Sequence, residues 1–467
     1  MHLKRLLRTA PWGLALVLGC GDDSGREDSD SGSSGNSNIS ASSGLSGLTT
    51  AGSDDSTGSS DGGTAGSDGG TDSSGSAGTS GDPTGGLKFD LGVTPDAAEE
   101  GCGGDGVAEF SFIWISNSAQ GTVSKIDTKT GVEMGRYWTD PSQGLGSPSR
   151  TSVNLLGDVA VSNRNQPSTT KIAALVDNCV DKNNNGVIET STGPGDVLPW
   201  GADECVLWHM PFPDSPGGSL GPRPTQWAGE QDANGCPLAN PRLWVAYEDG
   251  ADTAHFLRLD GATGAKLDEV TYPWPLSTGY GPYGGAVNAE GDLWAIGLYT
   301  DAPLVHIDSV TLQLTYHGNP GGVGFYGIAV DADGNPWIGG HNGVVFFDAQ
   351  TQQFTVIPTG GTTRGITVDR EGRAWAAADS GCGLVELDVA TRTVVNQLVP
   401  LPGCSSPWGV AVDVDGYIWS PDMSSNVAFK LDPDTHQVVL TVQGLIGPYT
   451  YSDMTGAGLG LVINPPG

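Results

Sequence analysis

Basic residues are scarce in this sequence. Its 467 residues include 21 Lys and Arg against 54 Asp and Glu, a formal net charge of −33. Because proteins that bind nucleic acids displace counterions with basic surface, this charge argues against a nucleic-acid partner. No run of 18 apolar residues occurs, so the sequence predicts no membrane-spanning helix. The motif HExxH, the usual signature of zinc proteases, is also absent.

The first residues have the pattern of a secretory signal peptide. Lys4, Arg5 and Arg8 precede a short apolar stretch that ends in Gly19-Cys20. This ending resembles a bacterial lipobox, so we expect residues 1–19 to be a lipoprotein signal peptide and Cys20 to carry the lipid. Plain export without lipid is the alternative.

Residues 20–86 are almost entirely Ser, Gly, Asp, Thr and Ala. Such a composition cannot bury enough apolar surface to fold, so we expect a disordered tether. The tether would hold the folded part, residues 87–467, at the extracytoplasmic side of the cell envelope. The membrane partner would be reached through the lipid anchor on Cys20.

Six cysteines remain once Cys20 is assigned to the lipid. An even number in an exported protein predicts three disulfides, for which 15 pairings are possible. Short loops favour Cys382–Cys404 and Cys179–Cys205, which leaves Cys102–Cys236. No CxxC motif occurs, so a zinc site is not expected.

An internal repeat determines the predicted fold. Residues 281–294, 326–337, 364–375 and 406–419 align as copies of one pattern, in which an inner Gly, an Asp-Gly or Glu-Gly turn and a Trp recur. The tryptophans at 294, 337, 375 and 419 are 43, 38 and 44 residues apart. Four short strands per roughly 40 residues is typical of a β-propeller blade.

We therefore predict an all-β fold with seven four-stranded blades. Six blades start near residues 148, 224, 282, 325, 363 and 407, and the first starts near 110 without its inner strand. Residues 448–456 match that missing strand and would close the ring beside Trp114. Six blades are the alternative if residues 200–272 are an insertion. Recurring glycines at 284, 327, 365 and 409 are expected where the inner strands crowd around the axis. The blade tryptophans are expected in the core: Trp114, Trp244, Trp294, Trp337, Trp375 and Trp419.

The repeat Gly-x-Ala-Val-Asp-x-Asp-Gly-x-x-Trp resembles the blades of streptogramin (virginiamycin B) lyase-like propellers, and less closely those of NHL-repeat propellers. The resemblance implies a lyase that opens cyclic depsipeptides with Mg²⁺, a His and a Glu. Family blades carry a Glu three residues past the Trp. The corresponding positions in this sequence are Asn117, Asn163, Tyr247, Gly297, Gly340, Ala378 and Asp422.

A second motif predicts a Ca²⁺ site. Oxygen-bearing residues alternate in residues 181–189, with Gly186 at the sixth position for the sharp turn. The expected ligands are Asp181, Asn183, Asn185, the Val187 carbonyl and Glu189. The loop lies in an insertion near residues 177–205, where the ion would be structural. A metal-free surface turn is the alternative.

The mouth of the central channel is the second candidate site. Strand ends should bring together His341 and Asp422, which could hold a metal or act as an acid/base pair. Arg150 replaces the inner-strand glycine of its repeat, so it could bind an anion or pair with an acid. Trp408, Tyr283 and Tyr326 would rim the axis. The other expected ligand-binding residues are Asn117, Asn163, Tyr247 and Asp379.

Three functions remain open at the level of sequence. The favoured one is a monomeric, membrane-tethered binding module for an envelope protein, peptide or glycan, because no blade has the Glu after its Trp. A metal-dependent lyase or lactonase at the channel mouth, using Mg²⁺, is the alternative. A purely structural surface protein is the third.

Overall fold

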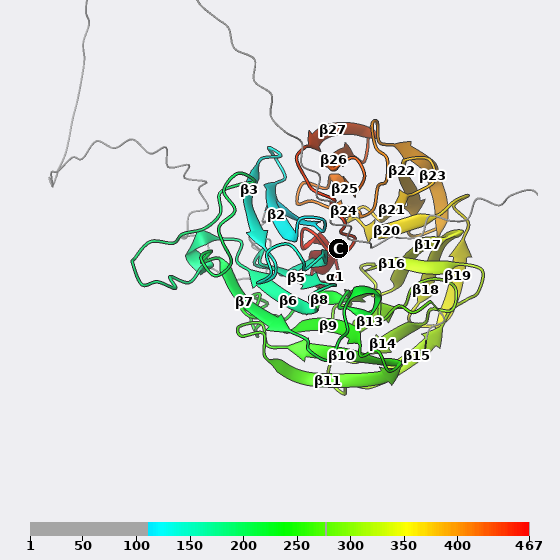
Figure 1. Ribbon diagram of the computed structural model, residues 1–467. Helices are drawn as coiled ribbons and strands as arrows, with labels where there is room; N and C mark the ends of the chain where they lie inside the picture. Colours follow the sequence, from blue (N-terminus) through cyan, green and yellow to red (C-terminus); the bar gives the residue numbers. More distant parts are fainter. Residues whose placement is uncertain (1–110, 276–277, 467) are drawn as a thin grey trace, which may run out of the picture. The chain divides into compact units, whose positions relative to one another are not determined.

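The computed structural model describes residues 111–275 and 278–466. The expected signal peptide, Cys20, the tether and Cys102 lie outside these residues. The described chain forms seven antiparallel sheets that follow one another around a central axis, and is a seven-bladed β-propeller (Figure 1). The all-β prediction is confirmed. Residues 225–273 form a sheet of their own, which decides for seven blades over six.

Each sheet is a meander whose strands pair in chain order. The first three sheets contain β1 (Phe112–Asn117), β2 (Thr122–Asp127), β3 (Glu133–Trp138); β4 (Pro148–Val153), β5 (Val159–Asn163), β6 (Ser168–Ile172), β7 (Val206–Pro211); and β8 (Thr225–Trp227), β9 (Leu243–Glu248), β10 (Thr253–Leu259), β11 (Lys266–Pro273). The next two contain β12 (Gly284–Val287), β13 (Leu293–Ile296), β14 (Leu304–Ile307), β15 (Leu314–Gly318); and β16 (Gly324–Val330), β17 (Pro336–His341), β18 (Gly343–Asp348), β19 (Gln353–Ile357). The last two contain β20 (Thr363–Val368), β21 (Arg373–Ala378), β22 (Gly383–Asp388), β23 (Thr393–Pro400); and β24 (Ala411–Val412), β25 (Ile418–Asp422), β26 (Val427–Asp432), β27 (Gln437–Val442).

The repeated Trp is buried in every blade that carries it, as expected. In three blades its indole Nε1 donates to the Asp that opens the preceding hairpin turn. The distances are 3.0 Å from Trp337 to Asp331, 3.0 Å from Trp375 to Asp369 and 2.8 Å from Trp419 to Asp413. The same carboxylates accept backbone N–H groups of their turns. The Asp of the repeat thus stabilises the turn and also holds the side chain of the buried Trp.

The inner glycines allow neighbouring blades to approach closely. A Cβ at Gly409 would lie 2.0 Å from the Thr450 carbonyl oxygen, and one at Gly327 would lie 2.6 Å from that of Arg364. The Gly365 N–H donates to the Trp408 carbonyl of the next blade, 3.0 Å away. A side chain at these positions would separate the inner strands, so glycine is required there.

The first blade is closed by the end of the chain. Its three strands lie beside residues 447–454, which bond to β1 through Trp114 N–H to the Met454 carbonyl (2.8 Å) and Tyr449 N–H to the Ser116 carbonyl (3.2 Å). Asn117 and Pro448 form an antiparallel bridge. The C-terminal segment therefore supplies the missing inner strand, as the repeat alignment predicted.

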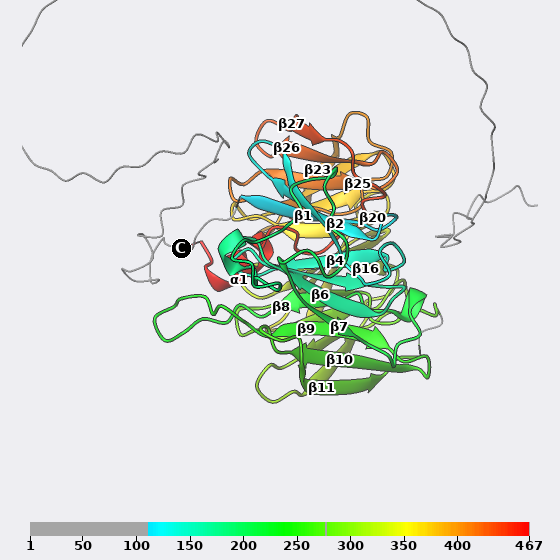
Figure 2. The ribbon, with the colours of Figure 1, turned by 60° about the vertical axis from the view of Figure 1, so that its left-hand side comes forward.

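The short helix α1 (Ala457–Ile463) follows the closing segment and covers one end of the axis (Figure 2). It buries Leu459, Leu461 and Val462. Leu459 also lines a narrow cavity on the axis, together with Val287, Val330 and Val368 at the ends of inner strands. The opposite end of the axis, where the inner strands begin, is the mouth of the central channel.

Two of the predicted disulfides are present, Cys179–Cys205 and Cys382–Cys404. Cys236 is also disulfide-bonded, but the predicted partner Cys102 lies outside the described residues. Disulfides fit an extracytoplasmic location, where they persist. Within residues 111–275 and 278–466, no helix is long and apolar enough to cross a membrane.

Candidate functional site: the mouth of the central channel

The channel mouth is built from equivalent positions of the seven innermost segments. The residue that precedes the inner glycine in the repeat lies at the start of each segment. Around the ring these residues are Tyr449, Ser149, Arg223, Tyr283, Tyr326, Arg364 and Trp408. The aromatic members form one buried cluster with Tyr451 and Leu298. This confirms that Trp408, Tyr283 and Tyr326 surround the axis.

Three tyrosine hydroxyls meet at the centre of this cluster. The Tyr283 and Tyr449 oxygens are 2.9 Å apart, those of Tyr326 and Tyr449 are 3.0 Å apart, and Tyr283 donates to Tyr326 over 3.2 Å. Burial raises the pKa of Tyr283 well above its usual value. The Tyr283 phenol is therefore neutral at physiological pH, and a neutral phenol can act as donor or acceptor.

Two buried arginines stack on these rings. The Arg150 guanidinium carbon lies 3.0 Å from the Tyr451 ring centroid, and one of its N–H groups donates to the Tyr283 carbonyl over 2.9 Å. Arg223 lies 5.0 Å from the Tyr283 centroid and donates to the Ser219 carbonyl over 2.7 Å. Only 1% of Arg150 and 2% of Arg223 are exposed. Burial lowers the pKa of Arg150 to about 9 and also lowers the pKa of Arg223.

Two further arginines complete a group of four. Arg164 lies 4.6 Å from the Tyr449 centroid and donates to the Ser147 hydroxyl over 2.7 Å. Arg364 lies 3.8 Å from the Trp408 centroid and forms an ion pair with Asp379 over 2.9 Å. Although burial alone lowers the pKa of Arg364, Tyr326 and Asp379 raise it overall.

Asp379 and Arg150 are the members of the predicted ligand set that belong to this cluster. The Asn117 amide is fully buried, donates to Ser124 (2.7 Å) and accepts from Ile446 N–H (2.9 Å), so it holds the closing segment. The Asn163 amide is also fully buried and bonds to Thr139 and Ser168. Both amides are occupied inside their blades.

Tyr247 has a structural environment as well. Its ring is stacked between Phe212 (5.3 Å) and His255 (5.1 Å), and burial raises its pKa to about 12.

His341 and Asp422 are not brought together. Asp422 is fully buried, and its carboxylate accepts the N–H groups of Ser405 (2.6 Å), Ser406 (2.8 Å) and Ser425 (2.7 Å). The His341 ring packs edge-on against Tyr299 at 5.1 Å, and burial followed by Arg364 lowers its pKa. In the described part of the chain, no hydrogen bond or ion pair joins the two. Asp422 instead shapes the loop before β24.

One group of potential metal ligands occurs among the described residues, namely Cys382, Cys404 and Asp422. The two sulfur atoms are joined in a disulfide, so they are not available as thiolate ligands.

Sequence reasoning missed Arg223, Arg364, Tyr449 and Tyr451 as site residues. The signal was present, because the first three of these align with Tyr283 in the repeat. Their side-chain types differ from blade to blade, however, so the alignment marks the position without showing that the arginines and tyrosines meet.

The predicted Ca²⁺ loop curls around its first carboxylate. Asp181 accepts the N–H groups of Asn185 (3.2 Å) and Gly186 (2.9 Å), and Gly186 has a φ of 83°. The amides of Asn183 and Asn185 both donate to the Glu189 carboxylate. The four side chains therefore converge, and rotation of either amide by 180° would direct its oxygen inward.

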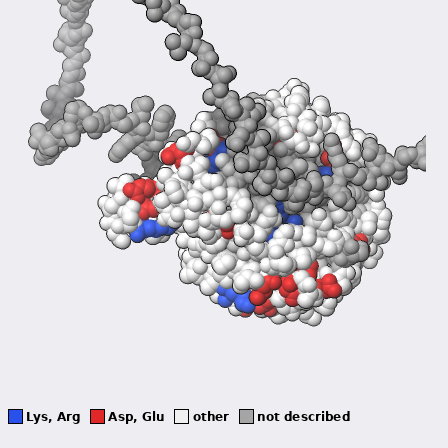
Figure 3. Space-filling view, in the orientation of Figure 1, with Lys and Arg blue, Asp and Glu red and all other residues white. Residues whose placement is uncertain are grey.

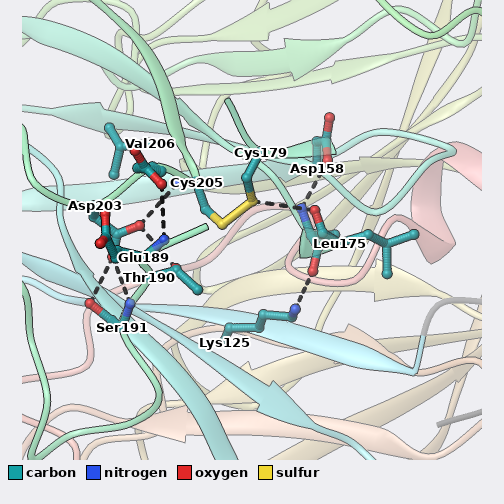
Figure 4. Close-up of a disulfide and its surroundings, with 12 residues drawn as sticks. Lys125, Asp158, Leu175, Cys179, Glu189, Thr190, Ser191, Asp203, Cys205 and Val206 are labelled. Carbon is teal, nitrogen blue, oxygen red and sulfur yellow. Dashed lines mark hydrogen bonds between the residues drawn. A yellow bond between two sulfur atoms is a disulfide. The ribbon is translucent and has the colours of Figure 1, made fainter. Parts of the chain in front are cut away.

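The insertion that carries this loop lies between β6 and β7 and is braced internally (Figure 4). Buried Glu204 accepts the N–H groups of Lys182 (2.8 Å) and Glu189 (2.9 Å). Asp203 accepts those of Ser191 and Cys205. These bonds and the Cys179–Cys205 disulfide fix the two ends of the loop.

Comparisons with known proteins find similar solved structures. No protein-family model and no curated protein matches the sequence. Virginiamycin B lyase from Staphylococcus aureus is a similar solved structure, with 13% identity, a TM-score of 0.45, and coverage of 64% of this chain and 85% of the lyase. Apo AztD from Citrobacter koseri has 12% identity, a TM-score of 0.47 and coverage of 73% and 97%. Hydrazine synthase from Kuenenia stuttgartiensis has 13% identity, a TM-score of 0.44 and coverage of 72% and 93%. The expected likeness to streptogramin lyase-like propellers is thus found, and it concerns the fold.

Proposed function

We propose that this protein is a binding module of the bacterial cell envelope that takes its ligand at the channel mouth. The observation that carries the proposal is the cluster of four arginines and five aromatic rings on the axis, opposite the end that α1 covers. Fold alone does not fix a ligand, whereas the side chains of this cluster restrict what can bind there. Rigid aromatic surface beside fixed donors is typical of ligand sites.

The geometry supports binding more than lyase chemistry. An acid/base or metal mechanism needs His341 and Asp422 within reach of one reacting atom. The oxygens of Asp422 are already taken by three backbone N–H groups. His341 lies at the mouth, next to Arg364, where it can contact a bound ligand.

The proposal is tested by offering the protein wall-glycan oligosaccharides, short peptides and lipid headgroups in saturation-transfer NMR. We expect one class to bind the protein and to lose binding in Arg364→Gln. The matched control is Arg242→Gln, which removes an arginine paired with Glu230 in a loop of the third blade. Equal loss in both variants, or binding that neither variant affects, would place the ligand elsewhere.

We also propose that residues 181–189 bind Ca²⁺ to stiffen the insertion. The convergence of Asp181, Asn183, Asn185 and Glu189, with the Val187 carbonyl, supports it. Two carboxylates imply modest affinity, suited to the higher Ca²⁺ levels outside cells. Calorimetry should show one site that Glu189→Gln abolishes. Asp196→Asn, which removes a charge elsewhere in the same insertion, should leave it intact.

Attachment to the membrane is proposed from the sequence alone, through a lipid on Cys20. Radiolabelled palmitate should be incorporated by the wild-type protein and not by Cys20→Ser. Equal labelling of both would contradict this anchor.

A further inference from the structure

The channel mouth has an excess of hydrogen-bond donors. Five buried polar atoms on its inner segments have no partner: Ser149 Oγ, Arg150 Nε, Arg223 Nε, Arg364 Nε and Trp408 Nε1. Four of these are N–H groups that can only donate. Buried donors are almost always paired in folded proteins, so a group of unpaired ones requires an explanation.

Positively charged side chains also gather at the mouth. The protein carries a net charge of −33, yet four arginines gather here. Arg150 lies against the rings of Tyr283 and Tyr451, and burial, together with the charge of Arg223, lowers its pKa. Arg223 likewise has Tyr280, Tyr283, Tyr449 and Arg164 around it.

Asp379 forms an ion pair with Arg364 in this group. Figure 3 shows basic atoms near the middle of the propeller face in view, and most acidic atoms toward its edge.

Burying arginines without counterions is unfavourable unless something repays the cost. Arg150 and Arg223 gain contacts with aromatic faces and backbone carbonyls, but these leave the Nε–H of each guanidinium without an acceptor. An acceptor-rich, negatively charged group is the chemical complement of donors in this arrangement.

We propose that the channel mouth binds the oxyanion of an acidic ligand, a carboxylate, phosphate or sulfate attached to an apolar or ring-shaped body. This inference rests on the proposed function and names the ligand class of the same site. Arg223 and Arg364 bind the oxyanion, and the buried Arg150 adds positive charge beside them. The half-buried rings of Tyr280 and Tyr299 contact the body of the ligand.

Asp379 has a defined role in this arrangement. Its side chain is 32% exposed and that of Arg364 is 16% exposed, so this pair is reachable from solvent. An incoming oxyanion competes with Asp379 for the Arg364 guanidinium. Removing the Asp379 charge should therefore strengthen binding, which a merely structural ion pair would not do.

The test is calorimetry on the purified protein with phenyl phosphate and benzoate as probes. Inorganic phosphate shows whether the oxyanion alone suffices, and benzyl alcohol is the neutral counterpart. We expect phenyl phosphate or benzoate to bind, added NaCl to weaken binding, and benzyl alcohol to bind at least tenfold more weakly.

Three variants complete the test, each with its melting temperature measured. Arg223→Met should weaken anion binding at least tenfold, and Asp379→Asn should strengthen it about fivefold, the effect of one nearby charge. Arg373→Gln, at the first residue of β21 and outside the mouth cluster, should match the wild type. Should Arg223→Met fail to fold, the Asp379→Asn result decides alone.

If benzyl alcohol binds as tightly as the anionic probes and Arg223→Met loses this binding, the mouth is a binding site but the proposal that it recognises an oxyanion is overturned. Weaker anion binding in Asp379→Asn, or absence of anion binding, would also overturn it. Failure of the glycan, peptide and lipid screen as well would overturn the proposed function.

Discussion

The hydroxyl of Tyr449 lies 2.9 Å from the hydroxyl of Tyr283, although 166 residues separate them in the chain. Tyr449 belongs to the C-terminal segment that closes the first blade, and Tyr283 begins the inner segment of the fourth. The contact shows that ring closure and the channel mouth are built by the same residues. Stability and binding should therefore be linked at this point.

Truncation before Ile446 removes the closing segment and α1. We expect the melting temperature to fall by more than 10 °C, or folding to become non-cooperative, because the inner edge of β1 is exposed. Circular dichroism during heating measures this. Removing only residues 465–467, which follow α1, should change little. A truncated protein as stable as the full chain would contradict closure by this segment.

Gly409→Ala tests the close approach of the inner strands. The added Cβ would lie 2.0 Å from the Thr450 carbonyl oxygen, so the backbones must separate. Overpacking of this kind costs about 1–3 kcal/mol. Gly195→Ala, in a loop with no atom within 4 Å of the new Cβ, is the control. Denaturant unfolding that ranks the two variants equally would argue against crowding at the axis.

Trp375 and Asp369 should be energetically coupled through the hydrogen bond between them. Asp369→Ala leaves the indole N–H and two turn N–H groups without their acceptor, at a cost of about 1–3 kcal/mol. A double-mutant cycle with Trp375→Phe should show a coupling of about 1 kcal/mol. Asp388→Ala, at an exposed turn acid, should cost less. Strict additivity of Asp369→Ala and Trp375→Phe would mean that the bond contributes nothing.

Lys125 should make stability rise with pH in alkaline solution. Its ammonium contacts the Ala174 carbonyl and the Phe112 ring, and burial lowers its pKa from 10.5 to about 8. Between pH 8 and 10.5 the unfolded chain holds the proton more tightly than the folded protein. Raising the pH therefore stabilises the fold, by up to about 1.4 kcal/mol per pH unit from this group.

Lys125→Met removes this dependence. The free energy of unfolding, measured by urea titration from pH 7 to 10, should rise less with pH in the variant than in the wild type. Identical slopes would mean that Lys125 is not buried as a charge. Lys129→Met, an exposed lysine in the same blade, is the control.

The fold was predictable because the same sequence pattern recurs from blade to blade. The Asp-Gly turn, the inner glycine and the core Trp recur at nearly constant spacing, and each copy reports a local constraint. The closing strand was also visible, since residues 448–456 repeat the inner-strand pattern. Blade three diverges in sequence, so only the structure decided between six and seven blades.

The site was predictable only in part. Arg150 was identifiable because it stands where other blades have glycine. Asn117, Asn163 and Asp422 looked like mouth ligands because they end strands, yet their polar atoms are already bonded to neighbouring backbone groups and hydroxyls. Which strand-end side chain faces the axis depends on packing between blades far apart in sequence, and a repeat pattern does not encode it.

The central claim is that the channel mouth binds a ligand and leaves it chemically unchanged. The most direct measurement is to incubate the protein with virginiamycin B and Mg²⁺ and to follow the ring by chromatography with mass detection. We expect an intact ring even at high protein concentration. A linear product that forms with the wild type and is lost in His341→Ala would contradict it, and would make the mouth a catalytic site.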